Sequence, residues 1–165
     1  MLKYNPIKLK IMHNWFEVKA TYEKTLENGM QKKVTESYLL DALSFTEAEA
    51  RAIEELKPYI SGKFTIAAVG RKKISELFFN DNGDRFFMAK VAFTTLDEKS
   101  GSEKITKVQM LAQAGDIDEA LAVVRKGMEG TMADWYFISV SETAIMDVFP
   151  YSAEESDNDG QTASN

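Results

Sequence analysis

Cationic and aromatic side chains on predicted strands are the residues of this sequence best suited to chemistry. Arg71, Lys72 and Lys73 are consecutive, and three adjacent cations repel one another unless an anion lies beside them. Aromatic rings interleaved with cations on a sheet can stack unpaired bases and hold phosphates, as in proteins that bind single-stranded nucleic acid. We predict this chemistry for one set of residues: Lys19, Lys63, Arg71, Lys72, Lys73, Lys90, Trp15, Phe86 and Trp135.

The aromatic residues also allow a second interpretation. Trp15-Phe16, Phe86-Phe87 and the run 135–137 place rings at adjacent strand positions, so one ring of each group points away from its core-facing neighbour. These outer rings either lie exposed beside the cations or cover one another, within the chain or at an oligomer interface. In the second case the protein is an interaction or structural protein, and the run 71–73 is an ordinary solvated turn.

Residues for covalent or metal chemistry are scarce. His13 is the only histidine and there is no cysteine, so nucleophile–base arrangements reduce to one candidate base. The sequence has neither a phosphate-binding Gly-Lys-Ser/Thr loop nor a Gly-x-Gly-x-x-Gly motif. The segment 80–84 lacks the spaced ligands of a calcium loop and is predicted to be a turn. We therefore predict a non-catalytic protein with no metal and no cofactor.

Charge is unevenly distributed along the chain. Of the net charge of −6, much lies after residue 151, where Glu154, Glu155, Asp157 and Asp159 occur without any Lys or Arg. Such a composition cannot offset the entropy of ordering, so residues 152–165 are predicted to be a disordered acidic tail. The tail is either a solubilising end or a polyanion that competes with nucleic acid for a basic groove and recruits replication or phage proteins.

The same composition predicts a cytoplasmic protein that does not enter the membrane. The absence of cysteine is typical of a reducing compartment. No apolar run approaches the roughly 20 residues that a membrane helix requires. The leader, residues 1–13, contains lysines and has no small-residue cleavage site, so we do not expect a signal peptide.

An internal repeat predicts the elements that position these side chains. Residues 14–79 resemble residues 85–151 at an offset of 70 or 71: Phe16–Tyr22 aligns with Phe87–Phe93. Each copy is predicted to be strand-strand-helix-strand-strand, and one helix cannot cover four strands. We therefore expect a single duplicated α+β domain over residues 14–151, with antiparallel sheet and two helices.

Helix starts are predicted from capping patterns. Thr46 with Glu49, and Asp116 with Glu119, have the spacing of a capping box. In the first helix, helical spacing predicts a buried stripe of four residues: Ala50, Ile53, Leu56 and Ile60. The Asn28-Gly29 pair predicts a tight hairpin between the first two strands.

Three motifs resemble a known family. They are Asn14–Lys19, Tyr38–Arg51 and Met146–Tyr151, and they resemble an uncharacterised, domain-of-unknown-function family of Bacteroidetes proteins with relatives in phages of those bacteria. The resemblance covers about residues 14–151. It implies a bacterial or phage host and supplies no catalytic or binding residues. From the cations and rings, together with this resemblance, we expect a protein that binds single-stranded nucleic acid in replication or phage biology.

Overall fold

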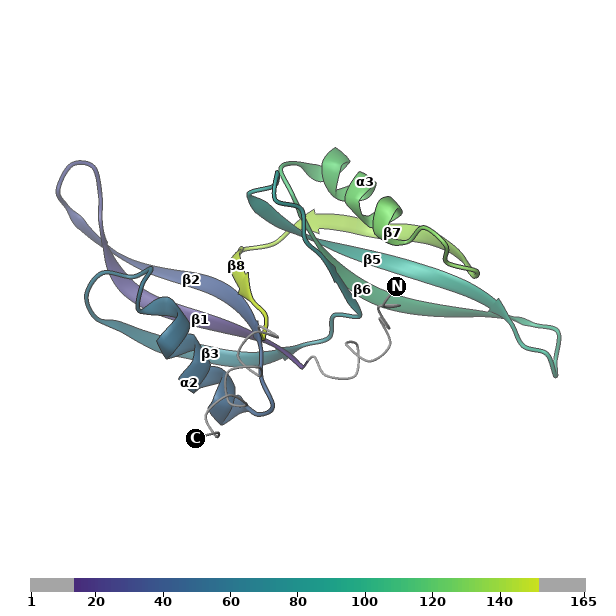
Figure 1. Ribbon diagram of the computed structural model, residues 1–165, viewed down its shortest axis with the longest axis horizontal. Coiled ribbons are helices and arrows are strands. Elements are labelled where there is room, and N and C mark those ends of the chain that lie inside the picture. The colour runs from purple at the N-terminus through teal and green to yellow at the C-terminus, as the bar shows by residue number, and fades with distance from the viewer. Residues whose placement is uncertain (1–13, 152–165) are drawn as a thin grey trace, which may run out of the picture. The chain divides into compact units, whose positions relative to one another are not determined.

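The computed structural model describes residues 14–151 (Figure 1), and the predictions for the leader 1–13 and the tail 152–165 lie outside the described residues. The strand-strand-helix-strand-strand order occurs twice, which confirms the predicted α+β class. The elements of the first copy are β1 (Trp15–Thr25), β2 (Gln31–Asp41), α2 (Phe45–Leu56), β3 (Phe64–Lys72) and β4 (Glu76–Phe78). Those of the second are β5 (Arg85–Leu96), β6 (Glu103–Ala114), α3 (Ile117–Gly127), β7 (Asp134–Glu142) and β8 (Ile145–Phe149).

The two copies exchange their closing strands. One four-stranded sheet has the order β3-β1-β2-β8, and the other has the order β4-β6-β5-β7. Accordingly, the described chain forms two compact units: residues 14–71 with residues 148–151 make the first unit, and residues 72–147 make the second. The pairs β1–β2, β5–β6 and β5–β7 are antiparallel as predicted, but β4 pairs with β6 in parallel.

In the first unit, the helix covers one face of the sheet (Figure 1). Alternate residues of β1 point toward α2, and a single core contains Phe16, Val18, Ala20, Tyr38, Leu40, Ala48, Ala52 and Leu56. Burying each large apolar side chain of this kind contributes about 1.5–3 kcal/mol. At the far end of the hairpin, Gly29 adopts a φ of 81° and the Asn28 side chain accepts a hydrogen bond from the Met30 amide at 3.0 Å, so the predicted turn is confirmed.

The start of α2 differs from the prediction. The N-cap is Ser44, whose hydroxyl accepts from the Glu47 amide at 3.1 Å, so the prediction for Thr46 is wrong. The prediction for Asp116 is confirmed, because its carboxylate accepts from the Glu119 amide at 2.8 Å. The error came from the alignment of the copies: Ser44 corresponds to Asp116, and Thr46 lies inside the helix.

The buried stripe of α2 shifts for the same reason. Ala50 and Ile53 are exposed, so these two predictions are wrong, whereas Leu56 and Ile60 are buried as predicted. The stripe consists of Ala48, Ala52 and Leu56, one helical turn apart. With Ser44 aligned to Asp116, these positions match Ala120, Val124 and Met128, which are the buried residues at the same place in and after α3.

In the second unit, a β-bulge sets which residues of β7 face α3. The register between β5 and β7 shifts between Lys90 and Val91, so Phe137 and Val140 both pack into the helix-side core although they are three positions apart in sequence. On α3, a Cβ atom at Gly127 would lie 2.3 Å from the Phe78 ring. A larger residue there would displace the Phe78 ring, so glycine allows this ring to lie against the helix.

A buried ion pair holds the end of the first unit together. Asp41 is fully buried, and Arg51 donates to its carboxylate at 3.0 Å and to its main-chain oxygen. The amide of Tyr151 donates to the same carboxylate at 2.8 Å, and the Arg51 guanidinium lies 4.1 Å from the centre of the Tyr151 ring. The last residue of β2, the helix and the segment after β8 are thereby joined at one point.

We predict that Ser44→Ala lowers the free energy of unfolding by about 1 kcal/mol, because the Glu47 amide loses its acceptor. Asp116→Ala should have a similar cost in the second unit. Thr46→Ala is the matched control and should leave the urea unfolding midpoint nearly unchanged. A larger loss for Thr46→Ala than for Ser44→Ala would contradict the observed cap.

Arg51→Met should lower the free energy of unfolding by about 3 kcal/mol, since it leaves the buried Asp41 carboxylate without its cation. The control is Lys57→Met, which removes an exposed pair with Glu54 at 2.8 Å and should cost less than about 1 kcal/mol. Equal losses for the two variants in urea melts would show that the buried pair is not special.

Candidate nucleic-acid interface

A groove in the second unit brings three lysines together. It has a volume of about 550 Å³ and is lined by residues 73–75 before β4, Lys90 on β5 and residues 106–109 on β6. The backbone amide and hydroxyl of Ser75 both donate to the Gln109 carbonyl, at 2.8 and 3.2 Å. These bonds hold the segment that carries Lys73 against β6. We call this groove, with Lys73, Lys90 and Lys107, the lysine groove.

Strand pairing explains why two of these lysines are neighbours. Lys90 is paired with Gln109 and Ala92 with Lys107 in the antiparallel β5–β6 ladder, so Lys90 and Lys107 are diagonal neighbours, about 7–8 Å apart. Val91 and Val108 belong to the core under α3. Because successive strand residues point to opposite faces, both lysines lie on the outer face of the sheet, away from the helix.

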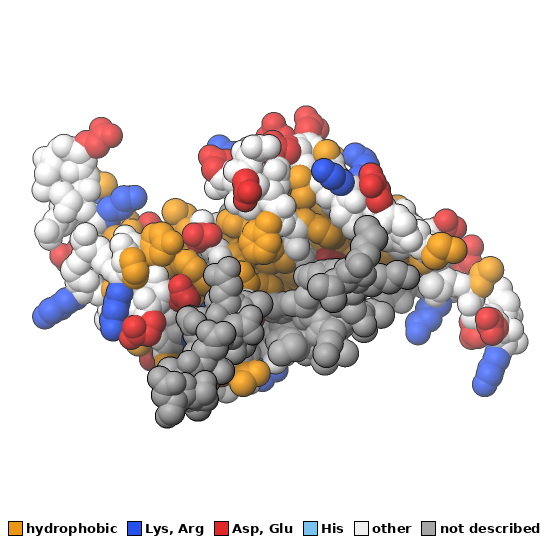
Figure 2. Space-filling model, in the orientation of Figure 1, with side chains coloured by type: hydrophobic (Ala, Val, Ile, Leu, Met, Phe, Trp, Pro, Cys, Tyr) orange, Lys and Arg blue, Asp and Glu red, His pale blue; other side chains and the backbone are white. Residues whose placement is uncertain are grey.

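No carboxylate balances this charge locally. None of the residues lining the groove is acidic, and within residues 14–151 none of the three lysines forms an ion pair. Two like charges about 8 Å apart repel by about 0.5–2 kcal/mol, depending on the local dielectric. An anion in the groove would remove this repulsion. Over α3, by contrast, acidic and basic side chains are interspersed (Figure 2).

The structure separates the other predicted cations from this groove. The Arg71 guanidinium lies 5.5 Å from the centres of both the Phe16 and Phe45 rings, in the first unit. Lys72 ends β3 and does not line the groove. Lys63 lines a different groove of about 540 Å³, and Lys19 is exposed opposite Ser37 on the sheet of the first unit. Of the predicted cations, only Lys73 and Lys90 lie together.

Two of the three predicted aromatic residues are buried, and the third packs on the helix side of its sheet. Trp15 is 7% exposed and Phe86 is 3% exposed, so the prediction that they present their rings on an open face is wrong. Trp135 is half-buried on the α3 side, where its ring meets Phe137 edge-on at 5.2 Å. Burial of Trp15 and Phe86 stabilises the fold and leaves neither ring a face for a base.

Two residues outside the predicted set belong to the same face. Tyr136 is 50% exposed and is paired with Ala92, which is paired in turn with Lys107. Strand alternation could have found Tyr136, because Trp135 and Phe137 on either side of it both face the core. Lys107 could be placed only once the register of the second hairpin was known.

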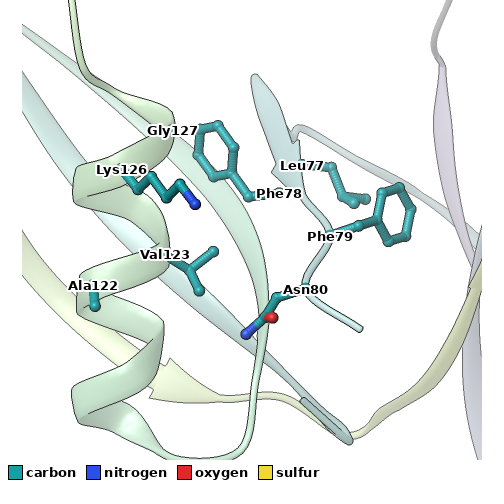
Figure 3. A pocket seen from close by; sticks show the side chains of 8 residues that line it. All are labelled: Leu77, Phe78, Phe79, Asn80, Ala122, Val123, Lys126 and Gly127. Carbon is teal, nitrogen blue, oxygen red and sulfur yellow. The ribbon is translucent and has the colours of Figure 1, made fainter. Parts of the chain in front are cut away.

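A second groove in the same unit is mainly apolar. It has a volume of about 580 Å³ and lies between the β4 segment and α3. Figure 3 shows Val123 and Lys126 reaching from the helix, with Phe78 on the helix side of β4 and Leu77 and Phe79 on the other. Phe79 is 54% exposed.

The segment predicted to be a turn instead of a calcium loop connects β4 to β5. The Gln113 side chain accepts from the Asn80 amide and donates to the Gly83 carbonyl, both at 3.0 Å, and the Asn80 side-chain amide donates to Glu119. Asn80 also accepts from Gly83 through the backbone at 2.9 Å. These contacts fasten the turn to β6 and α3. Within the described range, no three metal-binding side chains cluster.

Among the described residues of the first unit, Tyr22 has a shifted pKa. Burial and a 2.9 Å hydrogen bond to the Glu36 carboxylate raise the pKa of Tyr22. The other oxygen of Glu36 accepts from Tyr38 at 2.8 Å. Tyr22 therefore remains a protonated donor that fastens the outer part of the hairpin. Neither described helix is long and apolar enough to cross a membrane.

A family described as a domain of unknown function, DUF4494, matches residues 14–151. The chain belongs to this family. The DUF4494 match spans both copies of the repeat and all three motifs noted in the sequence, so the resemblance to a domain-of-unknown-function family is confirmed. No curated protein matches the chain. The lysine groove of this DUF4494 protein therefore has to be interpreted from its own geometry.

Proposed function

We propose that this protein is a non-catalytic single-stranded nucleic-acid-binding protein and that the lysine groove holds phosphates of the strand. The observation that carries the proposal is the grouping of Lys73, Lys90 and Lys107 around one groove without a carboxylate, in a chain whose net charge is −6. A local basic site on an acidic protein favours a ligand with several negative charges.

The duplication supports a role for these lysines beyond folding. The position of Lys73 corresponds to Ala144 in the other copy, and that of Lys107 to Thr35, since Ala92–Lys107 and Thr21–Thr35 are equivalent pairs. The two copies share their core pattern, yet only the second unit has the clustered cations. The scaffold forms without them, so their presence favours a ligand.

A sheet face that carries lysines on neighbouring strands suits a single strand. Lysines on such a face contact successive phosphates, and binding by several of them is steeply salt-dependent because counterions are released. We propose that binding takes place in the cytoplasm of a bacterium or of a phage-infected cell, in replication or phage biology. Support comes from the resemblance to Bacteroidetes and phage proteins and from the absence of cysteine.

The acidic tail has a place in the same proposal. Its four carboxylates occur without a cation, whereas the lysine groove has cations without a carboxylate. The tail is proposed to compete with nucleic acid for the groove and to recruit replication or phage proteins when a strand displaces it.

One observation favours the alternative, an oligomeric interaction or structural protein. The groove between β4 and α3 is lined mainly by apolar side chains, and Phe79 beside it is 54% exposed. Exposed apolar patches of this kind mark protein-binding surfaces. Under this alternative, Phe79→Ser would weaken self-association in sedimentation experiments and would leave strand binding unchanged.

For the nucleic-acid proposal, we predict the effect of combining Lys73→Ala, Lys90→Thr and Lys107→Thr. Polarisation of a labelled oligo-dT should show weaker binding at low salt. The slope of log affinity against log salt should fall by up to about 2, because each lost phosphate contact removes roughly 0.7. The first and last substitutions introduce residues that the other copy carries at the same places, so the fold should persist.

The matched control combines Lys24→Thr, Lys32→Thr and Lys104→Thr, which remove the same charge from exposed strand positions outside the groove. It should keep the parent slope. An equal loss in this control would mean that binding follows total charge, and no retention of oligo-dT by the intact protein at low salt would overturn the proposal.

Ending the chain at Tyr151 should tighten oligo-dT binding at low salt, because a competing polyanion is removed. At high salt the two chains should converge, since screening weakens the tail's attraction to the groove. Urea melts of both chains verify that the fold is unchanged. Identical affinities at low salt would contradict competition by the tail.

A further inference from the structure

We infer that Tyr136 is the base-stacking platform beside the lysine groove and that it makes the site select unpaired bases. The inference rests on the proposed function, because a base reaches Tyr136 only when its strand is held by the lysines. It adds a residue of a different chemistry, an aromatic ring, to a site otherwise made of cations.

The ring and the lysines form rows across three strands. One row runs from Tyr136 on β7 through Ala92 on β5 to Lys107 on β6. The next row runs from Ser139 through Lys90 to Gln109. Since neighbouring strands are about 4.8 Å apart, Tyr136 and Lys107 are separated by about 10 Å across the sheet.

The residue between ring and cation is small. Ala92 is fully buried in the middle of its row, so the accessible groups of this row are the Tyr136 ring and the Lys107 amine, and no long side chain of β5 stands between them. A nucleotide that spans the row can lay its base against the exposed ring while its phosphate points toward Lys107 and the groove.

The core keeps the Tyr136 ring outside. Trp135 and Phe137 pack on the α3 side, and the Arg125 guanidinium lies 5.3 Å from the centre of the Phe137 ring. Alternation then sends Tyr136 to the outer face, where it is 50% exposed. A lone exposed tyrosine is common on protein surfaces; the position of this one, in a row with Lys107, is what assigns it to the site.

Charge orients the strand over this face. Asp134 precedes Tyr136 on the same face, opposite Thr94, and its carboxylate repels a phosphate on that side of the ring. The lysines attract it on the other side. The other copy has neither the ring nor the lysine, because Thr65 corresponds to Tyr136 and Thr35 corresponds to Lys107.

Stacking on an exposed ring requires a base with a free face, which a duplex offers only at its ends. Removal of an aromatic platform typically lowers single-strand affinity by about 5- to 150-fold. A ring therefore distinguishes single strands from duplexes, whereas lysines alone attract both.

The test compares Tyr136→Thr, the residue of the equivalent position, with Tyr136→Phe, which keeps the ring. Labelled oligo-dT, an abasic strand of the same length and a duplex are the probes, each titrated at two salt concentrations. Tyr136→Thr should lose about 5- to 150-fold in affinity for oligo-dT and nothing for the abasic strand, with its salt slope unchanged. Tyr136→Phe should bind all three probes like the parent.

Ile138→Thr is the control, because Ile138 is a neighbouring apolar residue of β7 that is also exposed; it should leave binding unchanged. The inference is overturned if Tyr136→Thr binds oligo-dT like the parent, or if the unaltered protein binds the abasic strand as tightly as oligo-dT. The second comparison needs no variant, so it decides even if Tyr136→Thr does not fold. Either result leaves the lysine groove standing, whereas an absence of all strand binding would overturn both proposals.

Discussion

A β-sheet has two faces, and in each unit of this protein a single helix covers one of them. This constraint decides on which face of the sheet most strand side chains lie. Residues such as Phe16 and Val18 on β1, or Val91 on β5, must enter the core beneath a helix, while their neighbours point the other way. Lys90, Lys107 and Tyr136 lie on the outer face of the second sheet because the helix-side positions are occupied by core residues, and the buried residues Phe86 and Ala92 share that outer face.

The exchange of closing strands follows from the same need to complete a sheet. The three longer strands of each copy lack a fourth, and β4 and β8 supply it to the opposite sheet. In the first unit the chain is then fixed by the Asp41–Arg51 pair and the Tyr151 amide. In the second unit, the short segment before β4 is held on β6 through Ser75, and this contact brings Lys73 to the groove. The site thus depends on the exchange.

The sequence was sufficient for the element order, the hairpin turn and the Asp116 cap, because these follow from local spacing and from the repeat. It misplaced the first helix start, since Ser44 and Thr46 both have a Glu three residues later and only packing decides between them. It could not show the strand exchange, because pairing between distant strands is not encoded in local pattern. The sequence also predicted that Trp15 and Phe86 lie on an open face, whereas tertiary packing buries both rings. It predicted Trp135 as a contact residue instead of its exposed neighbour Tyr136.

The central claim is that strand phosphates lie in the lysine groove. Lysine acetylation read by mass spectrometry tests it directly, since bound oligo-dT shields only the amines that it contacts. The account predicts that oligo-dT protects Lys73, Lys90 and Lys107, while Lys24 and Lys104, exposed elsewhere, react as in the free protein. Protection of Lys24 or Lys104 without protection of the three groove lysines would contradict it.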